Sequence, residues 1–159
     1  MNSFLKYCLP LLIWLGVIFL GSIDQMSAEH TSRFILPFLR RLKPDISPET
    51  LAATHFMIRK SAHVGEYAVL AVLLLRAAIL MTNWKRWLPI VYLSVWGACL
   101  FVAATDEFHQ TFVASRGASA TDIAIDSGGA ILGLLIGAVF GIPRSIKRER
   151  ASVDSSAQP

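Results

Sequence analysis

Charged residues are scarce in this chain: they form only 16% of its 159 residues, while 54% are hydrophobic and the mean hydropathy is +0.53. Because soluble domains average about 25% charged residues, this composition excludes an ordinary soluble protein and predicts an integral membrane protein. Cysteine is also scarce. Cys8 and Cys99 both lie inside apolar stretches, which argues against a disulfide framework and favours two small buried side chains.

Familiar catalytic motifs are missing as well. The sequence contains no H-E-x-x-H zinc motif, no nucleophile elbow and no glycine-rich phosphate loop. No short motif therefore identifies a reaction, and nothing points to a nucleic acid as a partner. The lipid bilayer is the first partner that the composition predicts.

Four apolar stretches are long enough, or nearly so, to cross a bilayer, which takes about 20 residues. They cover residues 7–23, 62–82, 88–105 and 123–142. The predicted fold class is all-α: a four-span transmembrane helix bundle over residues 1–143, followed by a tail at 144–159 that is first basic and then disordered. A cleaved signal peptide is the less favoured alternative for the first stretch, because the run is long and no A-x-A site follows it.

The loop between the first two spans contains an amphipathic pattern. Apolar residues from Phe34 to Leu42 recur with helical spacing, opposite the basic residues Arg33, Arg40, Arg41 and Lys43. This predicts a short interfacial amphipathic helix that bends near Pro37 and stops at Pro44. A lid packed over the mouth of the bundle is an equally supported alternative. Ser47-Pro48-Glu49 then has the residues of a helix start, so the second span is expected to begin above the membrane.

Basic residues do not decide the orientation by number alone, because both sides of the membrane carry the same count. Arg59, Lys60 and Arg116 lie among carboxylates and histidines, whereas the basic residues of the Trp84–Trp87 turn and of the tail have no such neighbours. Setting those three aside predicts a multi-pass protein of the cytoplasmic membrane with both termini in the cytoplasm. Trp84 and Trp87 then serve as interfacial anchors.

Polar and ionisable residues gather at one set of ends of the last three spans. The residues are Lys60, His63, Glu66, Asp106, Glu107, His109, Gln110, Arg116, Asp122 and Asp126. Ionisable groups in a membrane are costly, so their convergence predicts a functional site. Ser119 to Asp122 has the spacing of a capping box, which leaves Asp122 equally open to a capping or a site role. Asp126 lies one turn deeper, where capping cannot explain it, and should face the bundle interior.

The residue types suggest two groups of candidates. The candidate catalytic residues are His63, Glu66, Asp106, Glu107 and His109, with the histidines as proton carriers or metal ligands and the acids as orienting groups or further ligands. The candidate substrate-binding residues are Lys60, Tyr67, Gln110, Arg116, Asp122 and Asp126, of which Lys60 and Arg116 would hold an anion. A divalent metal is an alternative that the spacing does not favour. An enzyme, a binding protein and a charge network that fixes helix register all stay open.

The last span carries a glycine every fourth residue, at Gly129, Gly133, Gly137 and Gly141. Such a strip lets a neighbouring helix approach closely. We interpret it as the packing surface of the bundle. A homodimer seam is the less favoured alternative.

These residues also carry a resemblance. The pattern Lys60-Ser61-Ala62-His63-x-x-Glu66-Tyr67, followed by Asp106-Glu107-x-x-Gln110 and, further on, Arg116 and Asp122, resembles the VanZ-like family of small bacterial membrane proteins. That family takes its name from a protein associated with teicoplanin resistance. The resemblance implies a cell-envelope role at the outer face of the cytoplasmic membrane, acting on or binding a lipid-linked or anionic compound. It implies no defined reaction, and an amide is usual in the family where this chain has Asp126.

Overall fold

The computed structural model describes residues 3–22, 28–81, 88–112 and 119–140. All regular structure in these ranges is helical: α1 (Ser3–Ser22), α2 (Ala28–Leu42), α3 (Pro48–Met81), α4 (Leu88–Gln110) and α5 (Ala120–Val139). The helices α1, α3, α4 and α5 are long and apolar enough to cross a membrane. The predicted all-α, four-span fold is therefore confirmed. The turn at 84–87, Arg116 and the tail at 144–159 lie outside the described residues.

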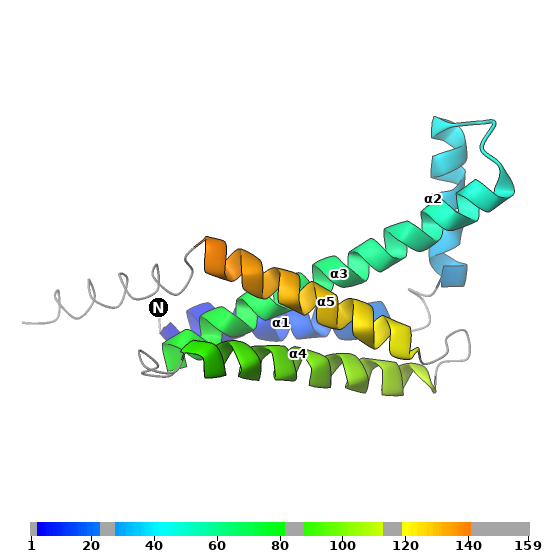
Figure 1. Cartoon of the computed structure of the whole chain (residues 1–159). Helices are drawn as coiled ribbons and strands as arrows, with labels where there is room; N and C mark the ends of the chain where they lie inside the picture. Colours follow the sequence, from blue (N-terminus) through cyan, green and yellow to red (C-terminus); the bar gives the residue numbers. More distant parts are fainter. Residues whose placement is uncertain (1–2, 23–27, 82–87, 113–118, 141–159) are drawn as a thin grey trace, which may run out of the picture.

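Helix α3 is the central element of the bundle. It contacts all four other described helices, most extensively α5. Figure 1 shows α1, α4 and α5 alongside its C-terminal part, while its N-terminal part projects beyond the bundle toward α2. The core between these helices includes the fully or almost fully buried Ile18, Leu70, Val95 and Ala130. Large outward-facing apolar side chains such as Phe101 are suited to lipid.

The start of α3 follows from its sequence. The backbone N–H of Thr50 donates to Ser47 Oγ at 3.2 Å, which satisfies one of the donors left open at a helix N-terminus. The helix then continues for 34 residues, which corresponds to about 50 Å at 1.5 Å per residue. A hydrocarbon core of about 30 Å cannot contain that length. The expected extension of the second span beyond the membrane is thus present.

Helix α2 has the predicted amphipathic character. It contains Pro37 and ends at Leu42, before Pro44. Figure 1 shows it lying crosswise beyond the end of the bundle. Phe34, Phe38 and Leu42 are 80%, 62% and 68% exposed, as expected for an apolar face that enters lipid rather than protein. The lid alternative holds in part, because Ile35 and Leu36 of α2 line cavities against α3.

The glycine strip is where α5 meets α3. A Cβ at Gly129 would lie 2.5 Å from the carbonyl oxygen of Val64, and one at Gly133 would overlap the carbonyl oxygen of Ala68. Only glycine allows the two backbones to come this close. Because α3 covers both positions, these two glycines do not form a homodimer seam. The contact instead sets the positions of the polar residues one turn above it.

Candidate functional site

Two pairs of ionisable side chains, each a basic residue of α3 and an aspartate of α5, join α3 to α5. Lys60 Nζ donates to Asp122 Oδ1. His63 Nδ1 lies 3.3 Å from Asp126 Oδ1. The two α3 residues are three positions apart and the two α5 residues are four apart, so the pairs follow each other by one helical turn. Asp126, which is 1% exposed, faces the bundle interior as the sequence predicts.

The capping box expected at the start of α5 does not form. Ser119 occupies the N-cap position with extended backbone, but its side chain makes no capping hydrogen bond. The carboxylate of Asp122 instead pairs with Lys60. The backbone N–H of Ser119 donates to Glu107 Oε2 at 2.7 Å, so α4 supplies the acceptor that a capping box would take from α5 itself.

The polar side chains at the C-terminal end of α4 point in two directions. Asp106, Glu107 and Gln110 are buried, and Gln110 Nε2 donates to Asp106 Oδ2 at 2.8 Å. His109 turns toward α1, where its Nδ1 lies 3.4 Å from Ser22 Oγ and its ring centroid lies 5.1 Å from that of Phe19. The structure therefore brings Asp106 and Glu107 toward the α3–α5 pairs and places His109 at the contact with α1.

Tyr67 and Glu66 connect the cluster to α1. Tyr67 is buried and lies within electrostatic range of Asp126, Asp106 and Glu66. A Cβ at Gly21 of α1 would lie 3.9 Å from Glu66 Oε1, so this carboxylate reaches the end of α1. The indole N–H of Trp14 donates to the backbone carbonyl of Glu66 at 2.9 Å. The predicted acids thus come from three helices, α3, α4 and α5, and Trp14 of α1 anchors the α3 backbone beside them.

A cavity of about 180 Å³, the inner cavity, is lined by residues of α1, α3 and α4 and by Ile35 of α2. Glu66, Asp106, Arg59 and His63 contribute its ionisable side chains, and Ser22 of α1 also lines it. Ser22 is not among the residues predicted from the sequence, where its one signal is its place beside Gly21 at the end of an apolar stretch. Two carboxylates line the inner cavity, against one permanent cation, Arg59, and the imidazole of His63.

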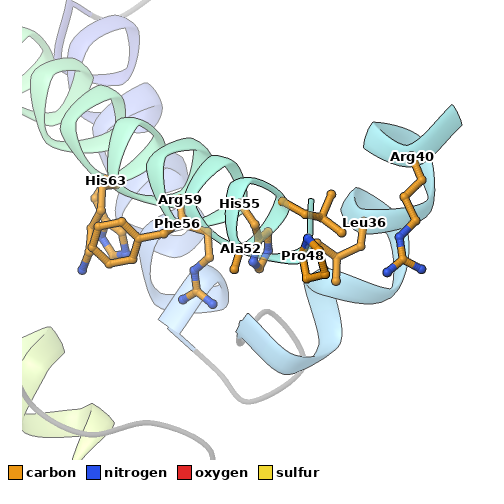
Figure 2. Close-up of a pocket in the computed structure, with 10 residues that line it drawn as sticks. Leu36, Arg40, Pro48, Ala52, His55, Phe56, Arg59 and His63 are labelled. Carbon is orange, nitrogen blue, oxygen red and sulfur yellow. The ribbon is translucent and has the colours of Figure 1, made fainter. Parts of the chain in front are cut away.

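A second cavity of about 480 Å³, the outer cavity, lies between α2 and α3. Figure 2 shows His55, Arg59 and His63 projecting from α3, with Leu36 and Arg40 coming from α2. Lys60 completes the basic side chains, while Leu51 and Phe56 add apolar surface. His55, Arg59 and His63 follow one another at four-residue intervals and form a stripe along α3. The contribution of α2 to this cavity was not predicted. No acidic side chain of the described residues lines this cavity.

Several buried polar atoms of the cluster have no hydrogen-bond partner among the described residues. They are His55 Nε2, Tyr67 Oη, Glu107 Oε1 and both carboxylate oxygens of Asp126. The approach of His63 Nδ1 to Asp126 is close, but it lacks the alignment of a hydrogen bond. Native proteins satisfy nearly all buried polar groups, so such a concentration needs an explanation. Water or a bound molecule is the ordinary one.

The described residues contain no group of three or more histidine, cysteine, aspartate or glutamate side chains arranged to hold a metal ion. Cys8 and Cys99 are both free thiols, and Cys99 is buried in the core. Arg116, the predicted anion-binding partner of Lys60, lies outside the described residues. The cations that the structure does place near the cluster are Arg59 and Lys60, with Arg40 further out on α2.

Comparison with known proteins is consistent with this architecture. A model of the VanZ/LLP1 family matches residues 7–141, from the first apolar helix to the end of the glycine strip. No curated protein and no solved structure matches the chain. Because the family match covers most of the 159 residues, the chain belongs to the VanZ-like family, as its polar motifs and four apolar helices indicate.

Proposed function

We propose that this VanZ-like protein binds an anionic, lipid-linked compound of the cell envelope at the polar end of its bundle, with His63 and Asp126 at the centre of the site. The observation that carries this proposal is the position of His63. It lines both cavities, and Asp126 of α5 lies 3.3 Å from its Nδ1. His63, like Arg59, is thus shared by the outer cavity and by the inner cavity with its two carboxylates, and its imidazole also faces Asp126.

The energetics favour a site over an inert core. Removing an ionised carboxylate from water costs on the order of several kcal/mol unless a partner in the protein replaces the lost hydration. Asp126 is 1% exposed, His63 Nδ1 lies 3.3 Å from its Oδ1, and neither carboxylate oxygen has an aligned donor among the described residues. Such an arrangement is costly as a purely structural feature. It is useful where charge has to act on a ligand.

The geometry suits proton transfer. With Nδ1 facing Asp126, the remaining ring nitrogen of His63 is the one available to exchange a proton with a bound group. Asp126 then acts as a positioning residue, which orients the imidazole and stabilises its charged form. Glu66 and Asp106 line the inner cavity beside it. These residues would serve an acid/base reaction and would equally serve recognition of a polar headgroup.

We place this site at the outer face of the cytoplasmic membrane. The argument is the distribution of basic residues, once those with acidic neighbours are set aside. A contribution to teicoplanin resistance is a further part of the proposal, which rests on the name of the family alone. Expression in a glycopeptide-susceptible bacterium should then raise the inhibitory concentration of teicoplanin. An unchanged inhibitory concentration would remove this part and leave the site hypothesis standing.

A second candidate is a non-catalytic charge network that fixes helix register. It is favoured by one observation: both charged pairs cross between α3 and α5, where Gly129 and Gly133 bring the backbones closest. The two candidates differ in what an isosteric change would do. Breaking a buried ion pair that only stabilises the fold costs about 3–5 kcal/mol. Neutralising a carboxylate that serves a ligand costs much less.

Glu66→Gln and Asp126→Asn test the choice between them, with Glu49→Gln as a matched control because Glu49 is exposed and lines neither cavity. We expect all three variants to reach the membrane at near wild-type level. Lipid-linked envelope compounds incubated with the purified proteins, followed by mass spectrometry, should show binding or conversion by wild type and Glu49→Gln only. Binding without conversion that survives Glu66→Gln would indicate recognition without catalysis, whereas register fixing predicts that Asp126→Asn lowers abundance and thermal stability instead.

A further inference from the structure

The outer cavity has the features of a site for a membrane lipid. Its lining among the described residues comes from two helices, α2 and α3, and its volume of about 480 Å³ falls within the usual range of roughly 300–1,000 Å³ for ligand sites. Arg40, Arg59 and Lys60 give it a net positive charge. Because no acidic side chain of the described residues lines it, the charge complement of this cavity is an anion.

His55 adds a second observation that is independent of net charge. Its side chain lines the outer cavity and is 9% exposed, and its Nε2 has no hydrogen-bond partner among the described residues. An imidazole N–H next to arginine side chains suits a phosphate oxygen, which accepts hydrogen bonds strongly from such donors. The cavity therefore offers a preformed set of donors as well as a positive field.

The position of α2 identifies the source of the anion. Its apolar side chains Phe34, Phe38 and Leu42 are exposed, and in Figure 1 the helix lies crosswise at the end of the bundle, as a helix lying in the membrane interface would. A cavity under such a helix lies at the depth of lipid headgroups. Leu36, Leu51 and Phe56 provide apolar lining for the glycerol and upper acyl region of a lipid.

We propose that the outer cavity binds the phosphate of an anionic phospholipid, with Arg40 on α2 and His55 and Arg59 on α3 as its donors. The inference rests on the proposed function, since it names the chemical class bound at the outer half of the same site. Lys60 contributes less than its position suggests, because it is engaged by Asp122. The acyl chains remain in the bilayer, and only the headgroup enters the cavity.

The test measures binding to the full-length protein in a neutral detergent. Dioleoyl phosphatidylglycerol and dioleoyl phosphatidylcholine, which share acyl chains and differ in net charge, are titrated while the midpoint of thermal unfolding is followed. We expect phosphatidylglycerol to raise the midpoint and phosphatidylcholine to raise it much less. Equal shifts would show that the cavity does not select an anion. An equal shift with water-soluble glycerol phosphate would show that a lipid is not its source, and either result overturns the proposal.

Arg40→Gln and Arg41→Gln form a matched pair of variants. Both arginines are exposed in the last turn of α2, but only Arg40 lines the cavity. Loss of one charge-assisted hydrogen bond should weaken phosphatidylglycerol binding about fivefold in Arg40→Gln. Arg41→Gln should bind as wild type does. Equal weakening in both variants would indicate attraction by the general surface charge of α2, and the proposal would fall.

His55→Phe guards against a result caused by misfolding. Replacing an unpartnered polar ring by an apolar one should leave the midpoint of the lipid-free protein unchanged or raise it, while binding of phosphatidylglycerol weakens. Undiminished binding in this variant contradicts the inference. Asp126→Asn should keep the phosphatidylglycerol shift. If Asp126→Asn also bound or converted the envelope compounds as wild type does, the proposed function alone would fall, whereas loss of phosphatidylglycerol selectivity in a wild-type protein that still binds those compounds would refute the lipid site alone.

Discussion

The outer and inner cavities share Arg59 and His63 but differ in charge. The outer cavity adds Arg40 and Lys60 and has no acidic side chain, whereas the inner cavity adds Glu66 and Asp106. The change of sign occurs along one stripe of α3, from His55 to Glu66, a distance of about 16 Å at 1.5 Å per residue. Under the two proposals above, this difference would separate two tasks: attraction of an anion by the outer cavity and proton chemistry at the inner one.

His63 lies at the boundary between the two cavities, and its Nδ1 lies 3.3 Å from Asp126 Oδ1 of α5. A ligand held by the basic side chains of the outer cavity would present its next atoms to the imidazole and then to the carboxylates. These side chains can meet a ligand in that sequence only if a rigid backbone holds them in place. The closest approach of α3 and α5 provides it, because Gly129 contacts the backbone of Val64, the residue after His63.

The largest expected effect concerns the side of the membrane on which both cavities lie. In a background of Cys8→Ala and Cys99→Ala, a cysteine replacing the exposed Ser47 at the start of α3 should react with a membrane-impermeant maleimide in intact cells. Ala118→Cys should react similarly, because residue 118 lies between the third and fourth spans, which puts it on the same side of the membrane as the start of the second span. Ser155→Cys should react only after permeabilisation. Labelling of Ser155→Cys alone would move both cavities to the cytoplasmic side.

The next largest effect tests whether the close contact between α3 and α5 holds His63 and Asp126 in place. Gly133→Leu should force α5 away from Ala68 and destabilise the fold by about 3 kcal/mol, as for other overpacked interfaces. The level of folded protein in the membrane, measured by size-exclusion chromatography after detergent extraction, should fall several-fold.

Gly128→Leu is the matched control for this change, because Gly128 is exposed and a Cβ there meets nothing within 4 Å. It should keep the wild-type level. If the two variants behaved alike, the α3–α5 contact would not determine where His63 and Asp126 meet.

The helices could be predicted largely because hydropathy and helix-start signals are local. Ser47 and Pro48 begin α3 as the sequence indicates, and α2 ends before Pro44. The predicted third span stops at 105, whereas α4 continues to Gln110. Hydropathy marks the part of a helix that can lie in hydrocarbon, and it does not register a polar turn that continues the same helix.

The site was harder to predict because it depends on how helices face each other. The inward direction of Asp126 followed from its spacing to Asp122, but its approach to His63 depends on the glycine contact between α3 and α5. His109 shares a helical face with Asp106 in the sequence, yet it contacts Ser22 and Phe19 of α1. No spacing along one helix reveals which neighbour each side of it will meet.

The smallest expected effect comes from a residue that lines neither cavity but controls the charge of the outer one. Asp122 holds Lys60, which lines the outer cavity, and both side chains are about one fifth exposed. Partly exposed ion pairs contribute only about 0–1 kcal/mol to stability, so Asp122→Asn should leave thermal unfolding nearly unchanged. Releasing Lys60 should nevertheless add a cation to the outer cavity and tighten phosphatidylglycerol binding about two- to threefold, an effect that shrinks as salt is raised. Thr121→Asn, an exposed neighbour in α5 with no acidic charge to lose, is the control and should bind as wild type does. Weaker lipid binding in Asp122→Asn would mean that the Lys60–Asp122 pair positions the cavity wall, and that the basic character of the outer cavity does not by itself determine what it binds.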